Sequence, residues 1–304
     1  MKRFKHPARF LEIEPELYGY QKSKFVVIPC PHEASTTYGK GTARGPAAIL
    51  RASQEVEWFD EELGYETYLK GGVYTLKPLA VGRLPSAVKK ILTEGKIPVV
   101  LGGEHSITPF AVKAAAEKYR DLSVLQFDAH ADLRDSYEGS KNNHACALRR
   151  VLEICPAVQV GIRSISAQEW EWARKTGQIN KIHRAEKLEI AEKIDNQLTK
   201  DVYLTIDVDV FDPSIIPSTG TPEPGGLFWY EVLDLLKAVC AAKNVVGWDV
   251  VELSPCSNAL KSAAWRSAAM PSPVSSTSKR TSTRAGSSRT TAACCRTLPW
   301  AVNF

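Results

Sequence analysis

The sequence lacks the features that mark membrane proteins and disulfide-rich secreted proteins. No apolar run among its 304 residues approaches the roughly 18 residues of a membrane span, and the N-terminus, Met-Lys-Arg-Phe-Lys-His-Pro, has no hydrophobic signal core. The seven cysteines are scattered, with neither Cys-x-x-Cys spacing nor a disulfide rhythm. We therefore expect a cytoplasmic protein with free thiols and no membrane partner.

Acidic residues are missing from one segment, residues 256–304, and this absence explains the basic charge of the chain. The whole chain has 39 Lys and Arg against 34 Asp and Glu, a formal net charge of +5. Seven of the basic residues lie in 256–304, which leaves 32 basic and 34 acidic residues elsewhere. No basic face with interleaved aromatic residues is evident, so nucleic acid is not an expected partner.

The rest of the composition is typical of a globular protein. The apolar fraction is 44% and the charged fraction 24%, and the length suits one large α/β domain or two small ones. Strand patterns alternate with helical patterns, which predicts a parallel sheet flanked by helices. The expected strands are 24–29, 98–101, 122–127, 157–162, 202–207 and 245–252; the expected helices begin at Gly45 and span 84–94, 108–118, 144–153, 168–174, 187–198 and 229–241. Residues 1–23 are polar, and we expect an arm that lies over the domain.

The strand expected at 122–127 is followed by Asp128-Ala-His130-Ala-Asp132. In an extended chain, residues two apart point the same way, so the three polar side chains can converge beyond the end of the sheet. Carboxylates and an imidazole without a thiolate suit a hard or borderline divalent cation such as Mn or Mg, and Zn less well. Taken alone, the triplet is equally compatible with a solvated loop.

Two further expected strands also end in metal-competent side chains. Asp207 and Asp209 close the strand that begins at Val202, and the strand that ends at Leu101 is followed by a glycine pair, Glu104 and His105. Open α/β sheets bind ligands at the carboxyl ends of their strands, so three such ends favour a metal site over coincidence. Two ions that share bridging carboxylates suit this set of two histidines and four aspartates: His105, Asp128, His130, Asp132, Asp207 and Asp209.

Two candidate catalytic residues are expected at the same end of the sheet. His144 begins a helix twelve residues after Asp132, where a neutral imidazole can donate or accept a proton near pH 7. The last expected strand delivers Glu252, which is placed to meet a cationic substrate. Asp249, in the same strand, is expected to be buried and hydrogen-bonded.

Two polar loops complete the candidate site. Residues 211–226 contain four prolines and three glycines together with Thr219, Thr221 and Glu223, while residues 31–42 contain His32 and Glu33. Each loop follows an expected strand, so each fits a pocket wall. Each fits ordinary turn or surface chemistry as well.

With these motifs assembled, the sequence resembles the ureohydrolase family of arginase and agmatinase, and agmatinase most. The motifs are Gly102-Gly-Glu-His105-Ser, Asp128-Ala-His-Ala-Asp132, Asp207-Val-Asp209, Thr219-Gly-Thr-Pro-Glu-Pro-Gly-Gly226 and Asp249-Val-Val-Glu252, and the similarity runs from residue 24 to Pro255. The resemblance implies a three-layer α/β/α fold of the arginase/deacetylase type with a mainly parallel sheet, in a domain spanning residues 1–255. It also implies two Mn²⁺ ions per subunit and a homo-oligomer, a trimer or a hexamer.

The resemblance also implies a mechanism. A hydroxide held between the ions would attack the guanidinium carbon of the substrate, oriented by Asp132. His144 matches the family's proton shuttle to the leaving amine, and Glu252 matches the acid that pairs with the guanidinium group. The two ions would be held by His105 with Asp132 and by His130 with Asp209, with Asp128 and Asp207 as bridges.

The substrate is less defined than the reaction. The loop before His144 is Arg134-Asp-Ser-Tyr-Glu-Gly-Ser140, as in agmatinases, and differs from the Asn- and Thr-rich loop with which arginases hold an amino-acid head group. Agmatine is therefore the expected substrate, with urea and putrescine as products. Candidate substrate contacts, besides His144 and Glu252, are Tyr137, Glu138, Thr219 and Glu223.

Three alternatives stay open. The chain could be another amidinohydrolase, acting on guanidinobutyrate, formiminoglutamate or arginine. It could be a deacetylase of the same fold, although such sites hold one Zn²⁺ with fewer carboxylates. It could also be a metal-binding family member without activity.

The family pattern ends abruptly after Pro255. Family members continue into a final amphipathic helix, whereas residues 256–304 contain ten Ser, nine Ala, six Thr and five Arg with little helical periodicity. Such a composition buries little apolar surface and predicts disorder. We interpret this tail as the product of a frameshift, with a native basic tail as the alternative.

Overall fold

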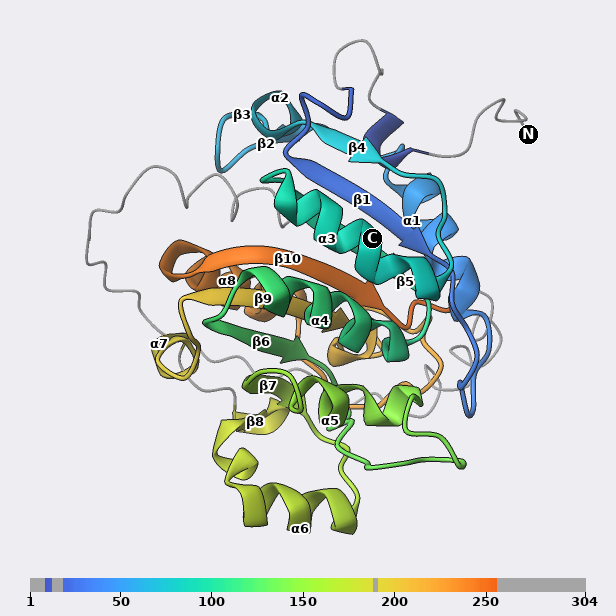
Figure 1. Ribbon diagram of the computed structural model, residues 1–304, viewed down its shortest axis with the longest axis vertical. Coiled ribbons are helices and arrows are strands. Elements are labelled where there is room, and N and C mark those ends of the chain that lie inside the picture. The colour runs from blue at the N-terminus through green and yellow to red at the C-terminus, as the bar shows by residue number, and fades with distance from the viewer. Residues whose placement is uncertain (1–8, 13–18, 188–190, 256–304) are drawn as a thin grey trace, which may run out of the picture.

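The computed structural model describes residues 9–12, 19–187 and 191–255, and its central feature is an eight-stranded sheet in which every pair of neighbours is parallel (Figure 1). The strand order is β4-β1-β5-β10-β9-β6-β7-β8. The strands are β1 (Phe25–Cys30), β4 (Val73–Thr75), β5 (Ile97–Gly102), β6 (Leu122–Phe127), β7 (Ala157–Ile162), β8 (Ile182–Arg184), β9 (Asp201–Asp207) and β10 (Asn244–Val251). The predicted parallel α/β sheet is confirmed.

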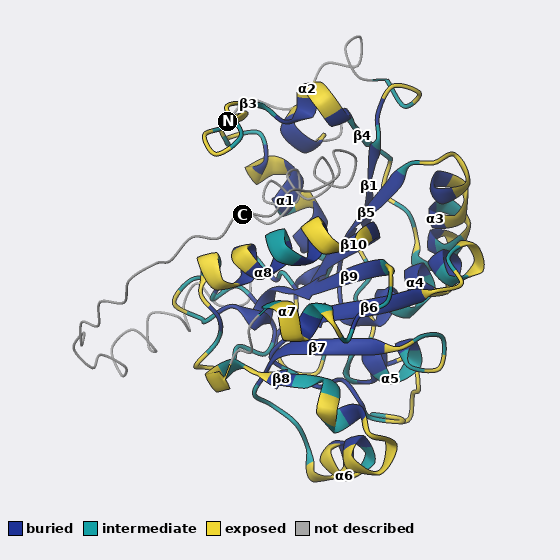
Figure 2. Ribbon diagram, turned by 90° about the vertical axis from the view of Figure 1, so that its left-hand side faces the viewer, coloured by how far each residue is buried: buried dark blue, intermediate teal, exposed yellow. Residues whose placement is uncertain are grey.

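Helices cover both faces of the sheet, which gives three layers (Figures 1 and 2). One buried apolar cluster joins the sheet to α1 (Gly45–Ala52), α7 (Ala191–Asp195) and α8 (Trp229–Ala242). A second joins the other face to α3 (Leu84–Thr93), α4 (Thr108–Lys118), α5 (Ala147–Val151) and α6 (Ala167–Thr176). Successive strand residues point to opposite faces, so a strand such as β6 contributes Val124 to one cluster and Leu125 to the other. In the part of the chain that is described, no helix is both long and apolar enough to span a membrane.

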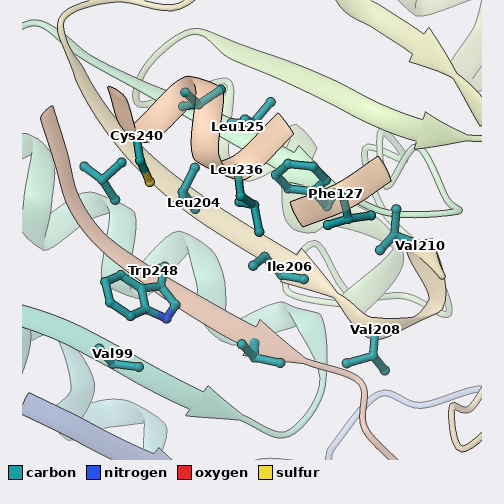
Figure 3. Close-up of a cluster of buried hydrophobic side chains, with 14 of the residues drawn as sticks. Val99, Leu125, Phe127, Leu204, Ile206, Val208, Val210, Leu236, Cys240 and Trp248 are labelled. Atoms are coloured by element: carbon teal, nitrogen blue, oxygen red, sulfur yellow. The ribbon is translucent and has the colours of Figure 1, made fainter. Parts of the chain in front are cut away.

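The central strands form the most deeply buried part of the molecule. Figure 3 shows Leu204 and Ile206 of β9 between Phe127 of β6 and Trp248 of β10, with Leu236 of α8 packed over them. Full burial of one such aliphatic side chain contributes about 1.5–3 kcal/mol. The strands that bear the candidate ligands are therefore held in register by close packing along their whole length.

Several details differ from the sequence-based expectation. The edge strands β4 and β8 were not predicted, because each has only three residues and neither is fully buried. Residues 55–81 also form a small hairpin, β2 (Phe59–Asp60) with β3 (Tyr65–Glu66), and a short helix, α2 (Tyr68–Gly71). Helix α7 covers only Ala191–Asp195 of the helix predicted at 187–198. Of the expected arm, residues 9–12 and 19–23 are described, and Phe10 and Leu11 pack into the core; the tail 256–304 lies outside the described residues.

The loops that follow β1 and β5 meet at Gly103. A Cβ atom built on Gly103 would lie 1.8 Å from the carbonyl oxygen of His32. The Gly103 N–H donates to Cys30 O (3.0 Å), and the Glu104 N–H donates to His32 O (2.9 Å). The absence of a side chain at residue 103 thus lets the 31–42 loop rest directly on the chain that leads to His105.

Replacing Gly103 by Ala tests this close approach. We expect Gly103→Ala to lower the free energy of unfolding by roughly 1–3 kcal/mol, because the backbone must move to make room for the methyl group. Gly82→Ala is the matched control, since a Cβ there meets no atom within 4 Å and its φ is not positive. Urea unfolding of both variants measures the difference; equal midpoints would contradict the role assigned to Gly103.

Candidate functional site

The strand ends bring the predicted ligands together at one edge of the sheet. Strands β5, β10, β9 and β6 are successive neighbours, and their carboxyl ends lie side by side (Figure 1). His105 follows β5, Asp128 follows β6, Asp207 ends β9, and Glu252 follows β10. Parallel pairing therefore collects residues that are up to 147 positions apart in the sequence.

Two histidines lie within contact distance of the four aspartates. His105 Nδ1 lies 3.1 Å from Asp128 Oδ2, 3.2 Å from Asp132 Oδ2 and 3.3 Å from Asp207 Oδ2. His130 Nδ1 lies 2.9 Å from Asp209 Oδ2 and 3.6 Å from Asp128 Oδ1. All six residues are buried except His130, which is partly exposed.

This arrangement fits two divalent cations. The donor atoms form two groups, His105 with Asp128 and Asp132, and His130 with Asp128 and Asp209, and within each group these atoms lie within 4.8 Å of one another. Asp128 belongs to both groups, as a bridging carboxylate would. His105 Nδ1 and Asp209 Oδ2 are buried without a hydrogen-bond partner among the described residues, which leaves both atoms free to coordinate. Carboxylate oxygens with imidazole nitrogens suit Mn²⁺ or Mg²⁺.

The backbone around the aspartates fixes their orientation. The His130 N–H donates to Asp128 Oδ1 (2.6 Å), the Ala129 N–H to Asp209 Oδ1 (3.0 Å), and the Asp209 N–H to Asp207 Oδ1 (2.9 Å). The first and third of these bonds close tight turns at the ends of β6 and β9, and the bond from Ala129 to Asp209 joins the two turns. The segment that follows Asp128 is accordingly not the extended run expected from the sequence, and Asp132 adopts a φ of 53°. Its carboxylate lies within 4.8 Å of that of Asp128 all the same.

The ring of His105 is oriented by residues behind the site. His105 Nε2 lies 2.9 Å from Thr205 Oγ1, and the Thr205 hydroxyl donates to Asp249 Oδ1 (2.6 Å). Because the single hydroxyl proton goes to the carboxylate, Thr205 accepts from Nε2–H, so a neutral His105 ring carries its proton on Nε2 and keeps the Nδ1 lone pair for an ion. Asp249 is fully buried and also accepts from Thr108 and Tyr203, as expected for a hydrogen-bonded core acid.

Burial and mutual repulsion change the ionisation of the carboxylates. Burial and the neighbouring charge of Asp128 raise the pKa of Asp132 to about 7. Burial and the charges of Asp209 and Asp128 raise the pKa of Asp207 well above its ordinary value. Burial would lower the pKa of His105, but the carboxylates of Asp128, Asp132 and Asp207, each 3.1–3.3 Å from Nδ1, raise it well above its ordinary value. The metal-free cluster therefore retains protons that bound cations would displace.

The cluster lies at the floor of a cavity of about 150 Å³. The cavity wall includes His144, Tyr137 and Glu252 from the predicted site, and it includes Thr221 in addition. Burial raises the pKa of Glu252 to about 8 in the metal-free state. Its Oε1 accepts a hydrogen bond from the His105 N–H (2.7 Å), and Glu252 adopts a φ of 64° directly after β10.

The other predicted substrate contacts lie in different places. Glu223 Oε1 is 3.7 Å from His130 Nε2, at the border of the metal cluster. Thr219 is buried, forms a backbone bridge with Leu253 and does not line the cavity; Thr221, two residues later, does. Glu138 is exposed on the loop before His144 and does not line the cavity either. The structure thus brings Tyr137 and Glu223 to the site but not Thr219 or Glu138.

Sequence inspection missed Arg163, the residue that follows β7. Its guanidinium Nη2 donates to the carbonyl oxygens of Asp209 and Glu223 (2.7 Å each), and its Nε donates to Pro224 O (3.1 Å). One side chain therefore joins the turn that bears Asp209 to the loop that bears Glu223. Its position directly after a buried strand was the available signal, but its partners are backbone atoms that no motif reveals.

Comparison with known proteins agrees with this geometry. The model of the Arginase family matches residues 23–270. The chain is 40% identical over 268 residues to the N(1)-aminopropylagmatine ureohydrolase of Synechocystis sp., covering 82% of this chain and 87% of that protein. It is 36% identical over 250 residues to the agmatinase of Bacillus anthracis, covering 78% and 86%. The crystal structure of the agmatine ureohydrolase of Thermoplasma volcanium aligns with a TM-score of 0.71 at 31% identity, covering 82% and 89%. The family match ends within the 256–304 segment, fifteen residues beyond Pro255.

Removing the shared carboxylate should abolish metal binding. We expect Asp128→Asn to bind less than one Mn²⁺ per chain where the parent binds two, because both groups of donor atoms lose a charge. Elemental analysis after gel filtration measures the stoichiometry. Asp121→Asn, which changes an exposed acid just before the other end of β6, is the control and should keep two ions. Two ions in the Asp128 variant would contradict the shared site.

The stability of the metal-free protein should fall as the pH rises. Asp132 and Glu252 have raised pKa values, about 7 and about 8, and His105 is raised as well, so the folded state binds more protons than the unfolded state between roughly pH 4 and 8. We expect the thermal midpoint in EDTA to decrease over this range, and Mn²⁺ to stabilise the protein more at pH 8 than at pH 5. A midpoint in EDTA that rises from pH 5 to pH 8 would contradict the protonation states described.

Proposed function

This chain belongs to the arginase family, and from that premise we propose that it hydrolyses the guanidino group of agmatine or of N1-aminopropylagmatine, with urea as the common product. The observation that carries the proposal is the pair of His/Asp groups that share Asp128 at the floor of a cavity bordered by Glu252 and His144. Agmatine would give putrescine as the second product.

The proposed ligands are the six residues of the cluster. His105 and Asp132 would hold one Mn²⁺ and His130 and Asp209 the other, with Asp128 and Asp207 between them. When bound, two such cations supply the Lewis acidity that makes water a nucleophile for the guanidinium carbon near neutral pH. Asp132 also offers a carboxylate oxygen that can accept a hydrogen bond from this water.

The cavity residues would position the substrate and move one proton. Glu252 keeps Oε1 on the His105 N–H, and its Oε2 has no hydrogen-bond partner in the described chain, so Oε2 is available to a guanidinium N–H. A planar guanidinium and a carboxylate fit each other, and the buried setting strengthens the pair. His144 would deliver a proton to the amine nitrogen as its bond to carbon breaks.

The far end of the substrate should meet acidic and aromatic groups. The adjacent imidazole of His130 (3.7 Å) and the charge of Arg163 lower the pKa of Glu223, so this partly exposed acid is ionised near neutral pH and can pair with an ammonium group. Tyr137 lines the cavity and lies under the guanidinium of Arg134, 4.6 Å from ring centroid to Cζ. Glu138 and Thr219 do not line the cavity, and neither is assigned a substrate contact.

The longer substrate is a specific second candidate. Three relatives with 40–42% identity are N(1)-aminopropylagmatine ureohydrolases by name, although a fourth, from Thermococcus kodakarensis, is 34% identical. Four agmatinases are 33–36% identical to this chain. Both substrates carry the same guanidino group and differ only in the polyamine end. The metal identity and the expected homo-oligomer remain predictions.

A panel of guanidino compounds tests the proposal. We expect urea release from the Mn²⁺-loaded chain with a kcat/KM for agmatine or N1-aminopropylagmatine at least about 100-fold above that for arginine or guanidinobutyrate, because the ionised Glu223 near the distal end attracts an ammonium group and repels a carboxylate. Formamide from formiminoglutamate is assayed in parallel. Preferred turnover of arginine, guanidinobutyrate or formiminoglutamate would overturn the substrate assignment, and no turnover of any compound would favour a silent family member.

A further inference from the structure

Glu104 is a fully buried acid to which the proposed chemistry gives no role. It precedes His105, yet its carboxylate points away from the metal cluster toward the 31–42 loop. Oε2 accepts the backbone N–H groups of Ala34 and Ser35 (2.7 Å each). Oε1 accepts the hydroxyl protons of Ser35 (2.8 Å) and Ser106 (2.6 Å). Four donors thus satisfy one buried carboxylate, and three of them belong to the 31–42 loop.

Ser35 connects this carboxylate to His144. The His144 backbone N–H donates to Ser35 Oγ (2.9 Å), and His144 Nδ1 lies 3.3 Å from the same oxygen. A serine hydroxyl has one proton, and in this structure that proton is directed at Glu104. Ser35 Oγ must therefore accept from His144, so the neutral imidazole carries its proton on Nδ1.

We propose that Glu104 and Ser35 form a hydrogen-bonded relay that holds His144 as the Nδ1–H tautomer and leaves Nε2 as the nitrogen that exchanges protons in the cavity. Ser35 and Glu104 are then positioning residues that act through His144. This inference rests on the proposed function, in which His144 delivers a proton to the leaving amine. Through Ser35, the negative charge of Glu104 also stabilises the protonated, imidazolium form of His144 from which the proton is delivered.

The surrounding fold holds Ser35 in place before any substrate binds. Glu33 accepts the N–H groups of Gly41 (2.9 Å) and Ala43 (3.0 Å), which closes the 31–42 loop on itself. The contact of Gly103 with His32 fixes the start of the loop, and the Gly39 N–H donates to Gly220 O (3.2 Å) near its end. On the opposite side, Asn143 caps the turn that begins at His144 by accepting from the Ala145 N–H (3.0 Å). Both partners of the Ser35–His144 contact are therefore anchored independently.

The tautomer of His144 tests the relay without any variant of Ser35. In metal-free protein labelled with ¹⁵N-histidine, two-bond ¹H–¹⁵N spectra distinguish a protonated Nδ1 from a protonated Nε2, and the His144→Gln variant assigns the resonance. We expect neutral His144 to be protonated on Nδ1. A neutral ring protonated mainly on Nε2 would overturn the proposal, whether or not the chain turns over any guanidino compound.

Kinetics of the full chain loaded with Mn²⁺ test the consequence for the reaction. We expect Ser35→Ala to lower kcat roughly 10- to 100-fold with KM changed less than about threefold, since general acid catalysis contributes roughly 10²- to 10⁴-fold and the variant loses orientation only. Ser35→Thr keeps a hydroxyl and should restore kcat to within about fivefold of the parent. Thr36→Ala removes a hydroxyl from the next residue of the loop and should leave kcat unchanged.

A double variant separates positioning from general damage to the fold. If Ser35 acts through His144, then Ser35→Ala combined with His144→Ala should be no slower than His144→Ala alone. Losses that multiply, or a Ser35→Ala enzyme with the parent kcat, would overturn the relay. Elemental analysis should show two Mn²⁺ in every one of these variants, because none removes a proposed ligand.

Discussion

Four buried carboxylates crowded together form the constraint on which the rest of this structure depends. Burying like charges together is strongly unfavourable, and it is tolerated only where protons, imidazoles or cations compensate. In the metal-free chain the two histidines and retained protons do so, as the raised pKa values of Asp132 and His105 show. Two divalent cations would provide the same compensation without protons. Metal binding, ionisation and folding are thus linked at one edge of the sheet.

The sheet makes this crowding possible. Strands β5, β10, β9 and β6 are buried on both faces, and their packing holds the turns that follow them in fixed positions. The ligand atoms need few supports of their own, since the turns at Asp128 and Asp207 supply backbone N–H groups to the carboxylates. Thr205 and Asp249 then set the ring of His105, and Arg163 ties the turn at Asp209 to the neighbouring loop. Precise ligand geometry follows from rigid strands with short turns.

Much of this site was predictable from the sequence, because each proposed ligand lies in a short motif next to an apolar run. Apolar runs that end in Asp or His identify buried strands and their carboxyl ends, which locates all six proposed ligands together with Glu252. The supporting residues were not predictable in the same way. Ser35 meets Glu104 across 69 positions and His144 across 109, and Arg163 binds only backbone oxygens, so no periodicity or spacing reveals them. Thr221 lines the cavity in place of the predicted Thr219 for a similar reason, because tertiary contacts decide where loop side chains point.

The sharing of Asp128 by two cations is tested most directly by locating the ions. Crystals grown with Mn²⁺, measured at the manganese absorption edge, give an anomalous difference map that shows each ion independently of any assumption about its ligands. Two peaks are predicted, one among His105, Asp128 and Asp132 and one among Asp128, His130 and Asp209. A single peak, or peaks away from these residues, would contradict the binuclear site.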